Sequence, residues 1–333
     1  MIRLCVVLLL LLSPSLALSE EVSVHESQSS DNAMRFIRVD HTFTSRGVKC
    51  GAWLYLPEGI SNPPVVVMAH GFGGQRWMRL PAYAERFAQQ GMAVFCFDYR
   101  GFNDSEGQPR NYINPSRHLE DWQSAISYVR TLDVVDSKRL ALWGTSFSAG
   151  HVIVMASRDP GISAIVAQVP FTDGITTAWS YSLPFQLKAI YHALWDVFDS
   201  VFTKHRHNVL IASTPGGAFG MMSTPDALTG MLNLLGSEGS KAFEKDNFCP
   251  ANIAITLAFY RPITKADKVT CPALVIGAQN DSLFPPDGPA KAAKRMKNAT
   301  YISLPMGHFE PYVGEPFEKL VVQMADFLKR NLQ

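Results

Sequence analysis

The feature that most constrains the fold is a short apolar stretch that runs into a turn with a serine at its apex. Residues 139–143 are typical of a buried strand, and a helix is predicted to begin near Phe147. Gly144 and Ser148 place small side chains on either side of Ser146, although a second glycine is more usual than Ser148. Such a strained strand-to-helix turn pushes one hydroxyl into a cleft. Ser146 is therefore a candidate nucleophile.

A glycine-rich turn follows an apolar strand further upstream. Residues 64–69 lead directly into His-Gly-Phe-Gly-Gly at 70–74. Because glycine has no Cβ, such a loop can aim backbone N–H groups into a cleft, where they can stabilise the oxyanion of an acyl-transfer reaction. Glycine runs are common, and a simple strand-to-helix turn is the alternative. We predict the N–H groups of Phe72 and Phe147 as the oxyanion donors.

Two further strand ends carry an acid and a histidine. The apolar stretch 272–278 is followed by Asp281, and the stretch 299–304 is followed by His308. A nucleophilic serine needs a general base and a group that orients that base, and open α/β sheets form their clefts at the carboxyl ends of strands. Asp281 could instead cap the next helix, and His308 could be an ordinary loop histidine. Their order after Ser146 nevertheless predicts a Ser-Asp-His triad.

On these motifs the chain resembles the α/β-hydrolase superfamily of serine hydrolases, in wording closest to its dienelactone-hydrolase, prolyl-oligopeptidase-like and acetyl-xylan-esterase-like branches. The stretch Asp-Tyr-Arg-Gly-Phe-Asn-Asp-Ser-Glu-Gly at 98–107 adds to the resemblance, and in such proteins it shapes the loop beside the nucleophile. The resemblance implies that Ser146 attacks an acyl carbonyl, that His308 carries the proton and that Asp281 orients the imidazole. No cofactor is expected, and no spacing suggests a metal site.

Alternating strand and helix patterns predict an α/β fold. A hairpin is expected from residues 36–43 and 48–55. Further strands are expected at 64–69, 92–98, 138–143, 162–168, 272–278 and 299–304, with helices at 78–90, 116–131, 147–158, 286–297 and 314–330. Continuous apolar strands separated by helices are typical of a mostly parallel, twisted sheet with helices on both faces. We assign residues 34–170 and 266–333 to an α/β-hydrolase core.

Residues 171–265, called the insertion below, break this alternation. The stretch is helix-prone and rich in aromatic residues, and it falls between the sixth and seventh strands. Similar hydrolases commonly carry a helical lid at this point, so the resemblance implies a lid. Trp179 and Phe185 are candidate residues of an acyl pocket, although these aromatic side chains could equally form the lid's own core.

The N-terminus carries a targeting signal. Arg3 precedes an apolar run from Leu4 to Leu12, and small residues follow. This pattern predicts a secretory signal peptide at 1–19, with residues 20–33 as a polar leader. An uncleaved anchor is the alternative, but the run is short and Pro14 interrupts it. We expect a secreted or periplasmic protein with no stable membrane span.

Composition narrows the class of partner. The chain has 333 residues, 47% of them hydrophobic, and a formal net charge of +1. No basic helix or RNA-binding motif accompanies this balance, so a nucleic-acid partner is not expected. Four cysteines remain after the predicted cleavage, and a bridge between Cys249 and Cys271 is one possibility. His205 and His207 could be read as a metal tract, but this spacing is more typical of a solvated turn.

These observations predict a serine hydrolase that cleaves a small-molecule carboxylic ester. A peptide or amide bond in a short peptide is the first alternative, as in the prolyl-peptidase relatives, but only about 35 residues precede the first hairpin here, leaving no room for their recognition domain. The second alternative is a non-catalytic ligand-binding protein on the same scaffold. Retention of all three triad residue types argues against it.

Overall fold

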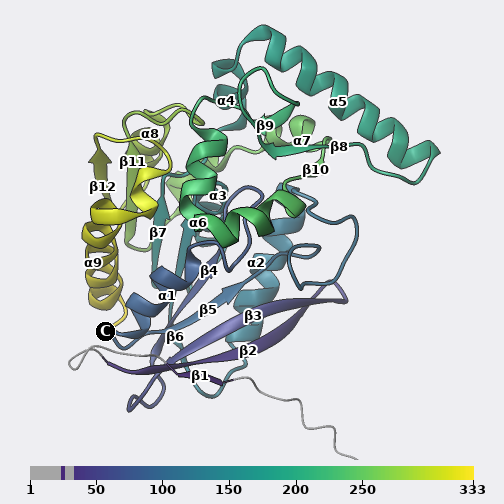
Figure 1. The fold of residues 1–333 in the computed structure, drawn as a ribbon. Coiled ribbons are helices and arrows are strands. Elements are labelled where there is room, and N and C mark those ends of the chain that lie inside the picture. The colour runs from purple at the N-terminus through teal and green to yellow at the C-terminus, as the bar shows by residue number, and fades with distance from the viewer. Residues whose placement is uncertain (1–23, 27–33) are drawn as a thin grey trace, which may run out of the picture.

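A twisted sheet flanked by helices forms the body of the molecule, and the insertion lies over one end of it (Figure 1). The computed structural model describes residues 24–26 and 34–333. The predicted signal peptide lies outside the described residues, as does most of the predicted leader. Among the residues that are described, no helix combines the length and apolarity needed to cross a membrane.

The main sheet has nine strands in the order β1-β2-β3-β5-β4-β6-β7-β11-β12. Their bounds are β1 Val24–Glu26, β2 Phe36–Ser45, β3 Val48–Pro57, β4 Pro64–Ala69, β5 Ala93–Phe97, β6 Asp136–Thr145, β7 Ala164–Gln168, β11 Ala273–Ala278 and β12 Ala299–Leu304. Strands β1 to β3 pair antiparallel, and β3 also pairs antiparallel with β5. The remaining pairs are parallel. The predicted hairpin and the predicted parallel sheet are both confirmed.

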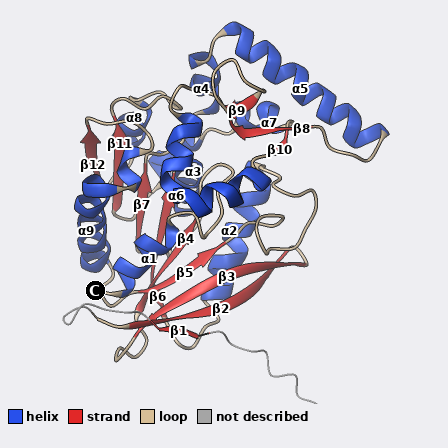
Figure 2. Cartoon of the chain, in the orientation of Figure 1, coloured by secondary structure: helices blue, strands red, loops and turns tan. Residues whose placement is uncertain are grey.

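Helices cover both faces of the sheet (Figure 2). Their bounds are α1 Leu80–Ala88, α2 Pro115–Val129, α3 Phe147–Ala156, α8 Gly288–Arg295 and α9 Gly314–Asn331. Alternate side chains of β4 enter opposite cores, because successive residues of a strand point to opposite faces. Val65 and Val67 belong to the core on the side of α2, α3 and α8, whereas Val66 and Met68 belong to the core on the side of α1 and α9. This two-sided burial explains why the central strands read as continuous apolar runs.

The insertion contains helices and a small sheet. Its elements are α4 Gly174–Ser180, α5 Leu183–Phe202, β8 Asn208–Ala212, β9 Gly220–Met222, α6 Ala227–Asp246, β10 Cys249–Pro250, α7 Ile253–Phe259 and the 3₁₀ helix η1 Pro262–Lys268, which leads back into the core. The sequence predicted only helices here, and the three-stranded sheet β10-β8-β9 was missed. These strands have two to five residues, too few for their period to separate them from a buried helical turn.

Candidate active site

Ser146 lies at the apex of a sharp turn between β6 and α3. Its backbone has φ 56° and ψ −120°, a strained conformation for a residue with a side chain. Strand and helix approach so closely that a Cβ on Gly144 would lie 2.5 Å from the carbonyl oxygen of Ser148. A Cβ on Gly150 would lie 2.5 Å from the carbonyl oxygen of Phe171. The first contact joins the strand and the helix of this turn, whereas the second packs α3 against the segment that follows β7.

Three predicted side chains meet in one hydrogen-bonded row. The Nε2 atom of His308 lies 3.1 Å from the Ser146 hydroxyl, and its Nδ1 atom lies 2.7 Å from Oδ2 of Asp281. An ionised carboxylate only accepts hydrogen bonds, so Nδ1 carries the proton of a neutral imidazole and Nε2 is left to accept from Ser146. The structure thus brings Ser146, Asp281 and His308 together from the ends of three strands.

Asp281 is held by the backbone that follows it. Its Oδ1 atom accepts the N–H groups of Leu283 at 2.9 Å and Phe284 at 3.0 Å, while Oδ2 faces His308. Its side chain is 5% exposed and that of His308 is 3% exposed. Asp281 therefore does cap the next turn, but only with Oδ1. Its other oxygen, Oδ2, contacts His308, so the capping alternative describes only part of its role.

A buried polar cluster holds the strand end that carries Ser146. The hydroxyl of Tyr312 bonds to that of Thr145, the residue before Ser146. The side-chain amide of Gln168 donates to the Thr145 hydroxyl at 3.3 Å and accepts from the Tyr83 hydroxyl at 3.2 Å. The backbone carbonyl of Gln168 accepts the backbone N–H of Ser146. Burial raises the pKa of the Tyr83 and Tyr312 phenols. Sequence reasoning missed this cluster, whose only signal was a polar residue at the end of each of two apolar strands.

The predicted oxyanion loop lies directly against the nucleophile. A Cβ on Gly71 would come within 3.0 Å of both Ser146 Cβ and the Thr145 carbonyl oxygen, so the backbone preceding Phe72 touches the turn. The rings of Phe72 and Phe147 pack edge to face with centroids 5.7 Å apart. Phe147 is the first residue of α3, where N–H groups lack an intrahelical acceptor. Within residues 34–333, neither amide has a protein acceptor.

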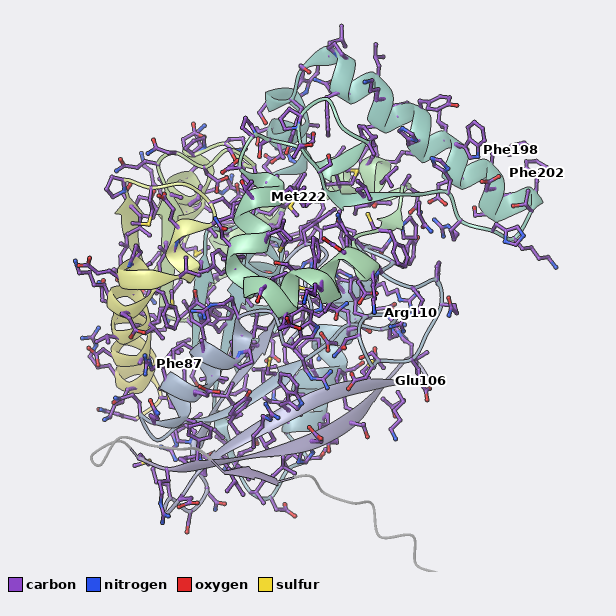
Figure 3. All side chains as sticks on the ribbon, in the orientation of Figure 1. Phe87, Glu106, Arg110, Phe198, Phe202 and Met222 are labelled. Carbon is purple, nitrogen blue, oxygen red and sulfur yellow. The ribbon has the colours of Figure 1, made fainter. Side chains whose placement is uncertain are left out.

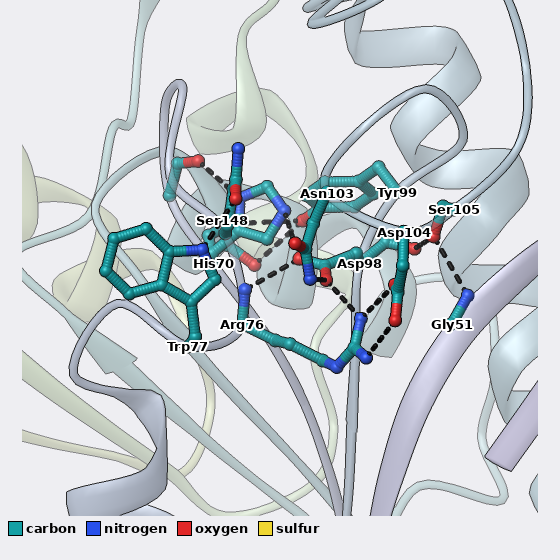
Figure 4. A network of polar contacts seen from close by, with 12 residues as sticks. Gly51, His70, Arg76, Trp77, Asp98, Tyr99, Asn103, Asp104, Ser105 and Ser148 are labelled. Carbon is teal, nitrogen blue, oxygen red and sulfur yellow. Dashed lines mark hydrogen bonds and ion pairs between the residues drawn. The ribbon is translucent and has the colours of Figure 1, made fainter. Parts of the chain in front are cut away.

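An ionic network anchors this loop to the 98–107 stretch (Figure 4). Asp98 accepts the backbone N–H of Arg76 at 2.6 Å and contacts its guanidinium, which also reaches Asp104. His70 Nε2 lies 3.3 Å from the same carboxylate. Burial alone would raise the pKa of the Asp98 carboxyl, but His70 and the Arg76 charge outweigh it and hold that pKa below its usual range. His70 thus supports the loop, and neither of its ring nitrogens bonds to Ser146.

A second buried network lies behind Phe147. His151 Nδ1 bonds to the Tyr260 hydroxyl at 2.6 Å, and its Nε2 lies 3.3 Å from Nδ1 of His118. The His118 ring stacks on Tyr99 with centroids 3.9 Å apart. Burial lowers the pKa of His151 to about 3 and that of His118 well below its usual range, so both rings are neutral. The His151 ring packs edge-on against Phe147, which helps to fix that residue.

Two cavities meet beside Ser146. The smaller, about 50 Å³, is lined by Ser146 and His308 among others. The larger, about 180 Å³, is lined almost entirely by apolar side chains of the core and the insertion. Phe72 and Met222 line both cavities. An apolar chamber therefore adjoins the polar row, with a predicted oxyanion residue at the junction.

The two predicted pocket residues have different surroundings. Phe185, at the start of α5, lines the larger cavity. Trp179 does not line it and is 78% exposed, so its assignment to the pocket was wrong. On the short helix α4, the face toward the cavity carries Gly174 and Thr177, and a residue two positions after Thr177 points away from it.

The other predicted chemistry is simple to place. Cys249 and Cys271 are free, as are Cys50 and Cys96. Between residues 34 and 333, no group of histidine, cysteine and carboxylate side chains is arranged to hold a metal ion. His207 bonds to His192 at 2.8 Å and stacks on its ring, so it belongs to a local contact in the insertion.

Comparison with known proteins defines the class. The family model described as alpha/beta hydrolase fold matches residues 64–315. The chain therefore belongs to the α/β-hydrolase fold family. It is 40% identical over 292 residues to the quorum-quenching protein AidA of Acinetobacter baumannii, an alignment covering 88% of this chain and 94% of that protein. It is 32% identical over 145 residues to the thiohydrolase aneE of Aspergillus aculeatus, covering 44% and 45%.

Solved structures share the fold. The α/β hydrolase GrgF from Penicillium sp. sh18 matches with a TM-score of 0.73 and 21% identity, over 89% of this chain and 99% of that one. Est1E from Butyrivibrio proteoclasticus, solved with ferulic acid bound, matches with a TM-score of 0.59 and 18% identity, over 88% and 99%. At these identities the likeness concerns the fold alone.

Proposed function

We propose that this protein is a serine hydrolase that cleaves carboxylic esters of apolar acyl groups through an acyl-enzyme. The observation that carries the proposal is the row of Ser146, His308 and Asp281 opening beside an apolar cavity of about 180 Å³. A nucleophile, a base within hydrogen-bond reach and a group that orients the base are the minimum for acyl transfer by serine.

In the first half of the reaction, the Ser146 oxygen attacks the ester carbonyl carbon while its proton passes to Nε2 of His308. Asp281 holds Nδ1–H and stabilises the imidazolium that forms. The carbon–oxygen bond to the alcohol then breaks, and the alcohol leaves with the proton from His308. In the second half, water loses a proton to His308 and attacks the acyl carbon, which releases the acid and restores the Ser146 hydroxyl.

Backbone donors stabilise the charge that develops on the carbonyl oxygen. The N–H groups of Phe72 and Phe147 come from two elements that meet at the nucleophile, and both are without protein acceptors within residues 34–333. Donors fixed in this way need no reorganisation during the reaction, and each is worth about 10²- to 10³-fold in rate. The two side chains take no part in this donation, although both line the larger cavity.

The apolar cavity supports an acyl group with an extended hydrocarbon part. Its walls come from Phe72 and Phe147 in the core and from Phe171, Phe185 and Met221 in the insertion. The smaller cavity, which contains His308, would take the alcohol. A thioester is the second candidate substrate, because the same steps serve a thiol leaving group and the relative from Aspergillus aculeatus is named a thiohydrolase.

Covalent labelling tests the proposal directly. A fluorophosphonate probe should label wild-type protein on Ser146, identified by peptide mapping, and should not label Ser146→Ala. Ser148→Ala serves as the matched control, since Ser148 is buried in the same turn and accepts a hydrogen bond from Tyr99. Absence of labelling in properly folded wild-type protein would favour the non-catalytic alternative.

A substrate panel then separates the candidates. p-Nitrophenyl esters of graded chain length, matched thioesters and aminoacyl-nitroanilides would be compared by kcat/KM. We expect the esters or thioesters to be hydrolysed and the anilides to be inert. Preferential cleavage of the anilides would instead support the peptidase alternative.

Export is a separate proposal that rests on the sequence alone. The apolar run from Leu4 to Leu12 and the small residues after it suggest cleavage near residue 19. N-terminal sequencing of protein recovered from outside the cytoplasm tests it. An intact Met1 on the exported protein would contradict cleavage.

A further inference from the structure

Helix α5 exposes a large apolar surface at the outer edge of the insertion. It extends away from the body of the molecule, with Phe198 and Phe202 near its far end (Figure 3). Ten large apolar side chains of this one helix are exposed: Leu183, Leu187, Ile190, Tyr191, Leu194, Trp195, Val197, Phe198, Val201 and Phe202. Phe202 is 71% exposed and Leu194 is 58% exposed.

These side chains form one continuous face. At about 100° per residue, the ten positions fall within a single arc of the helix. The opposite side carries Ala189, Ala193 and Asp196, which are buried against the rest of the insertion. A helix whose outward side is apolar along its whole length is typical of one that is covered on that side as well.

The face is large enough for a stable interface. At ~150 Å² for each fully exposed large side chain, the observed exposures amount to roughly 900 Å². The largest apolar patch on a typical monomer is about 300–600 Å², whereas a standard interface buries about 800 Å² on each partner. The α5 face is therefore larger than the apolar patch of a typical monomer and as large as one side of a standard interface.

The charges beside the face indicate what covers it. Lys188 and Asp199 lie along the same border of the apolar arc, because their spacing of eleven residues corresponds to slightly more than three full turns. In an antiparallel pair of α5 helices related by a twofold axis, like borders meet. Lys188 of one copy then lies level with Asp199 of the other, twice over, with Leu194 near the axis. Between residues 34 and 333, Lys188 has no carboxylate partner within its own chain.

We infer that α5 is the interface of a homodimer in which two copies pack antiparallel about a twofold axis near Leu194. A lipid surface fits the face less well. Helices that lie on membranes typically carry many lysines and arginines beside their apolar side, whereas α5 carries one lysine, Lys188, and one aspartate, Asp199, beside its exposed face. An isologous pair, in contrast, uses both signs of charge and buries the same apolar surface on each copy.

Sedimentation velocity over a wide concentration range tests the inference. Wild-type protein is expected to sediment as a dimer, and Leu194→Asp as a monomer with an unchanged circular dichroism spectrum. Val322→Asp is the matched control, because Val322 is 57% exposed on α9, outside α5, and should leave the dimer intact. A wild-type protein that stays monomeric throughout, or a Leu194→Asp variant that still dimerises, would overturn the inference.

Charge reversal tests the antiparallel register. Lys188→Glu or Asp199→Lys alone should weaken dimerisation roughly two- to fivefold, as expected for exposed ion pairs. The double variant should restore it, because each reversed charge again meets its opposite. Losses that simply add would overturn the register. Flotation of monomeric wild-type protein with phosphatidylcholine vesicles would assign the face to a lipid surface instead.

Discussion

The core and the insertion differ in which side chains they bury and which they expose. In the core, functional side chains are buried and held by specific partners, as Asp281 is by two backbone N–H groups and His308. The insertion has two comparable centres: Asp196 pairs with Arg206 and accepts the N–H of Asn252, and Asp173 pairs with Arg261 and accepts the N–H of Ile175. Its longest outward-facing helix, α5, leaves its apolar side chains uncovered. The core therefore defines the chemistry, and the insertion provides surfaces.

The two regions are nevertheless joined at the proposed oxyanion loop. Gln75 donates to Asp246 at the end of α6 with a distance of 3.0 Å. A Cβ on Gly73 would lie 2.4 Å from the side chain of Ile211 in β8, so the loop fits directly beneath the insertion. Movement of the insertion would therefore reach Phe72, which lies between the two cavities. The comparison can be tested by changing one region and measuring the property assigned to the other.

The largest effect is expected at the nucleophile. Ser146→Ala should lower kcat by roughly 10⁴- to 10⁶-fold while leaving the thermal unfolding midpoint almost unchanged, because the hydroxyl contributes to the reaction and little to packing. The measurement is steady-state ester hydrolysis beside a melting curve. Ser148→Ala should keep most activity, since the Tyr99 hydroxyl can still donate to the backbone carbonyl oxygen of His70, 3.3 Å away. Activity of Ser146→Ala within tenfold of wild type would reject the assignment.

A smaller loss is expected when the oxyanion loop is displaced. The Cβ added by Gly71→Ala would meet Ser146 Cβ and the Thr145 carbonyl oxygen at 3.0 Å, so loop and turn must separate. Loss of one aligned donor should lower kcat by about 10²- to 10³-fold. Gly161→Ala is the control, since its new Cβ meets the end of the flexible Arg130 side chain and neither the loop nor the turn. Equal activities in the two variants would refute a catalytic role for the loop geometry.

Much of the core could be predicted because its constraints are local. Each central strand is buried on both faces and therefore appears as a continuous apolar run, and the residues at its carboxyl end follow directly. This was enough to place Ser146, Asp281 and His308 in one row. It could not give the cluster of Tyr83, Gln168, Thr145 and Tyr312, because hydrogen bonds between distant segments leave no periodic pattern in the sequence.

The insertion was predicted less well for a related reason. In the helices of the insertion, the sequence pattern around an apolar residue is the same whether its side chain faces a cavity, the insertion's own core or the outside. Trp179 and Phe185 looked equivalent in the sequence, yet one is exposed and the other lines the larger cavity. Tertiary packing decides between such positions. The small sheet around β8 was missed because strands this short also form through tertiary contacts and show no clear period in the sequence.

Acid stability should depend on the buried histidines of the core. The folded-state pKa of His151 is about 3, below its value of about 6.5 in an unfolded chain, and burial lowers that of His118 in the same direction. The unfolded state therefore binds more protons below pH 6.5. Stability is fully present above that pH and is lost as pH falls, by up to about 1.4 kcal/mol per pH unit for each group.

The variant His151→Gln should make that loss less steep, because it removes one of the two buried groups while keeping a partner for Tyr260. Urea midpoints measured from pH 7 to pH 4 would show this. His205→Gln, at an exposed position of the insertion, is the control and should follow the wild-type slope. Identical slopes for all three proteins would exclude the histidine pair as the cause of acid sensitivity.

The smallest effect is expected in the insertion, on substrate choice. Phe185→Ala enlarges the apolar cavity without touching the row of Ser146 and His308, so fluorophosphonate labelling should persist. The preferred acyl chain should become longer, with kcat/KM ratios between chain lengths changing by roughly tenfold, since each buried methylene contributes about 0.8 kcal/mol. Trp179→Ala is the matched control, because that side chain is exposed on the neighbouring helix α4. If both variants shift the preference equally, the insertion acts through its overall position, and the division of labour between core and insertion does not hold.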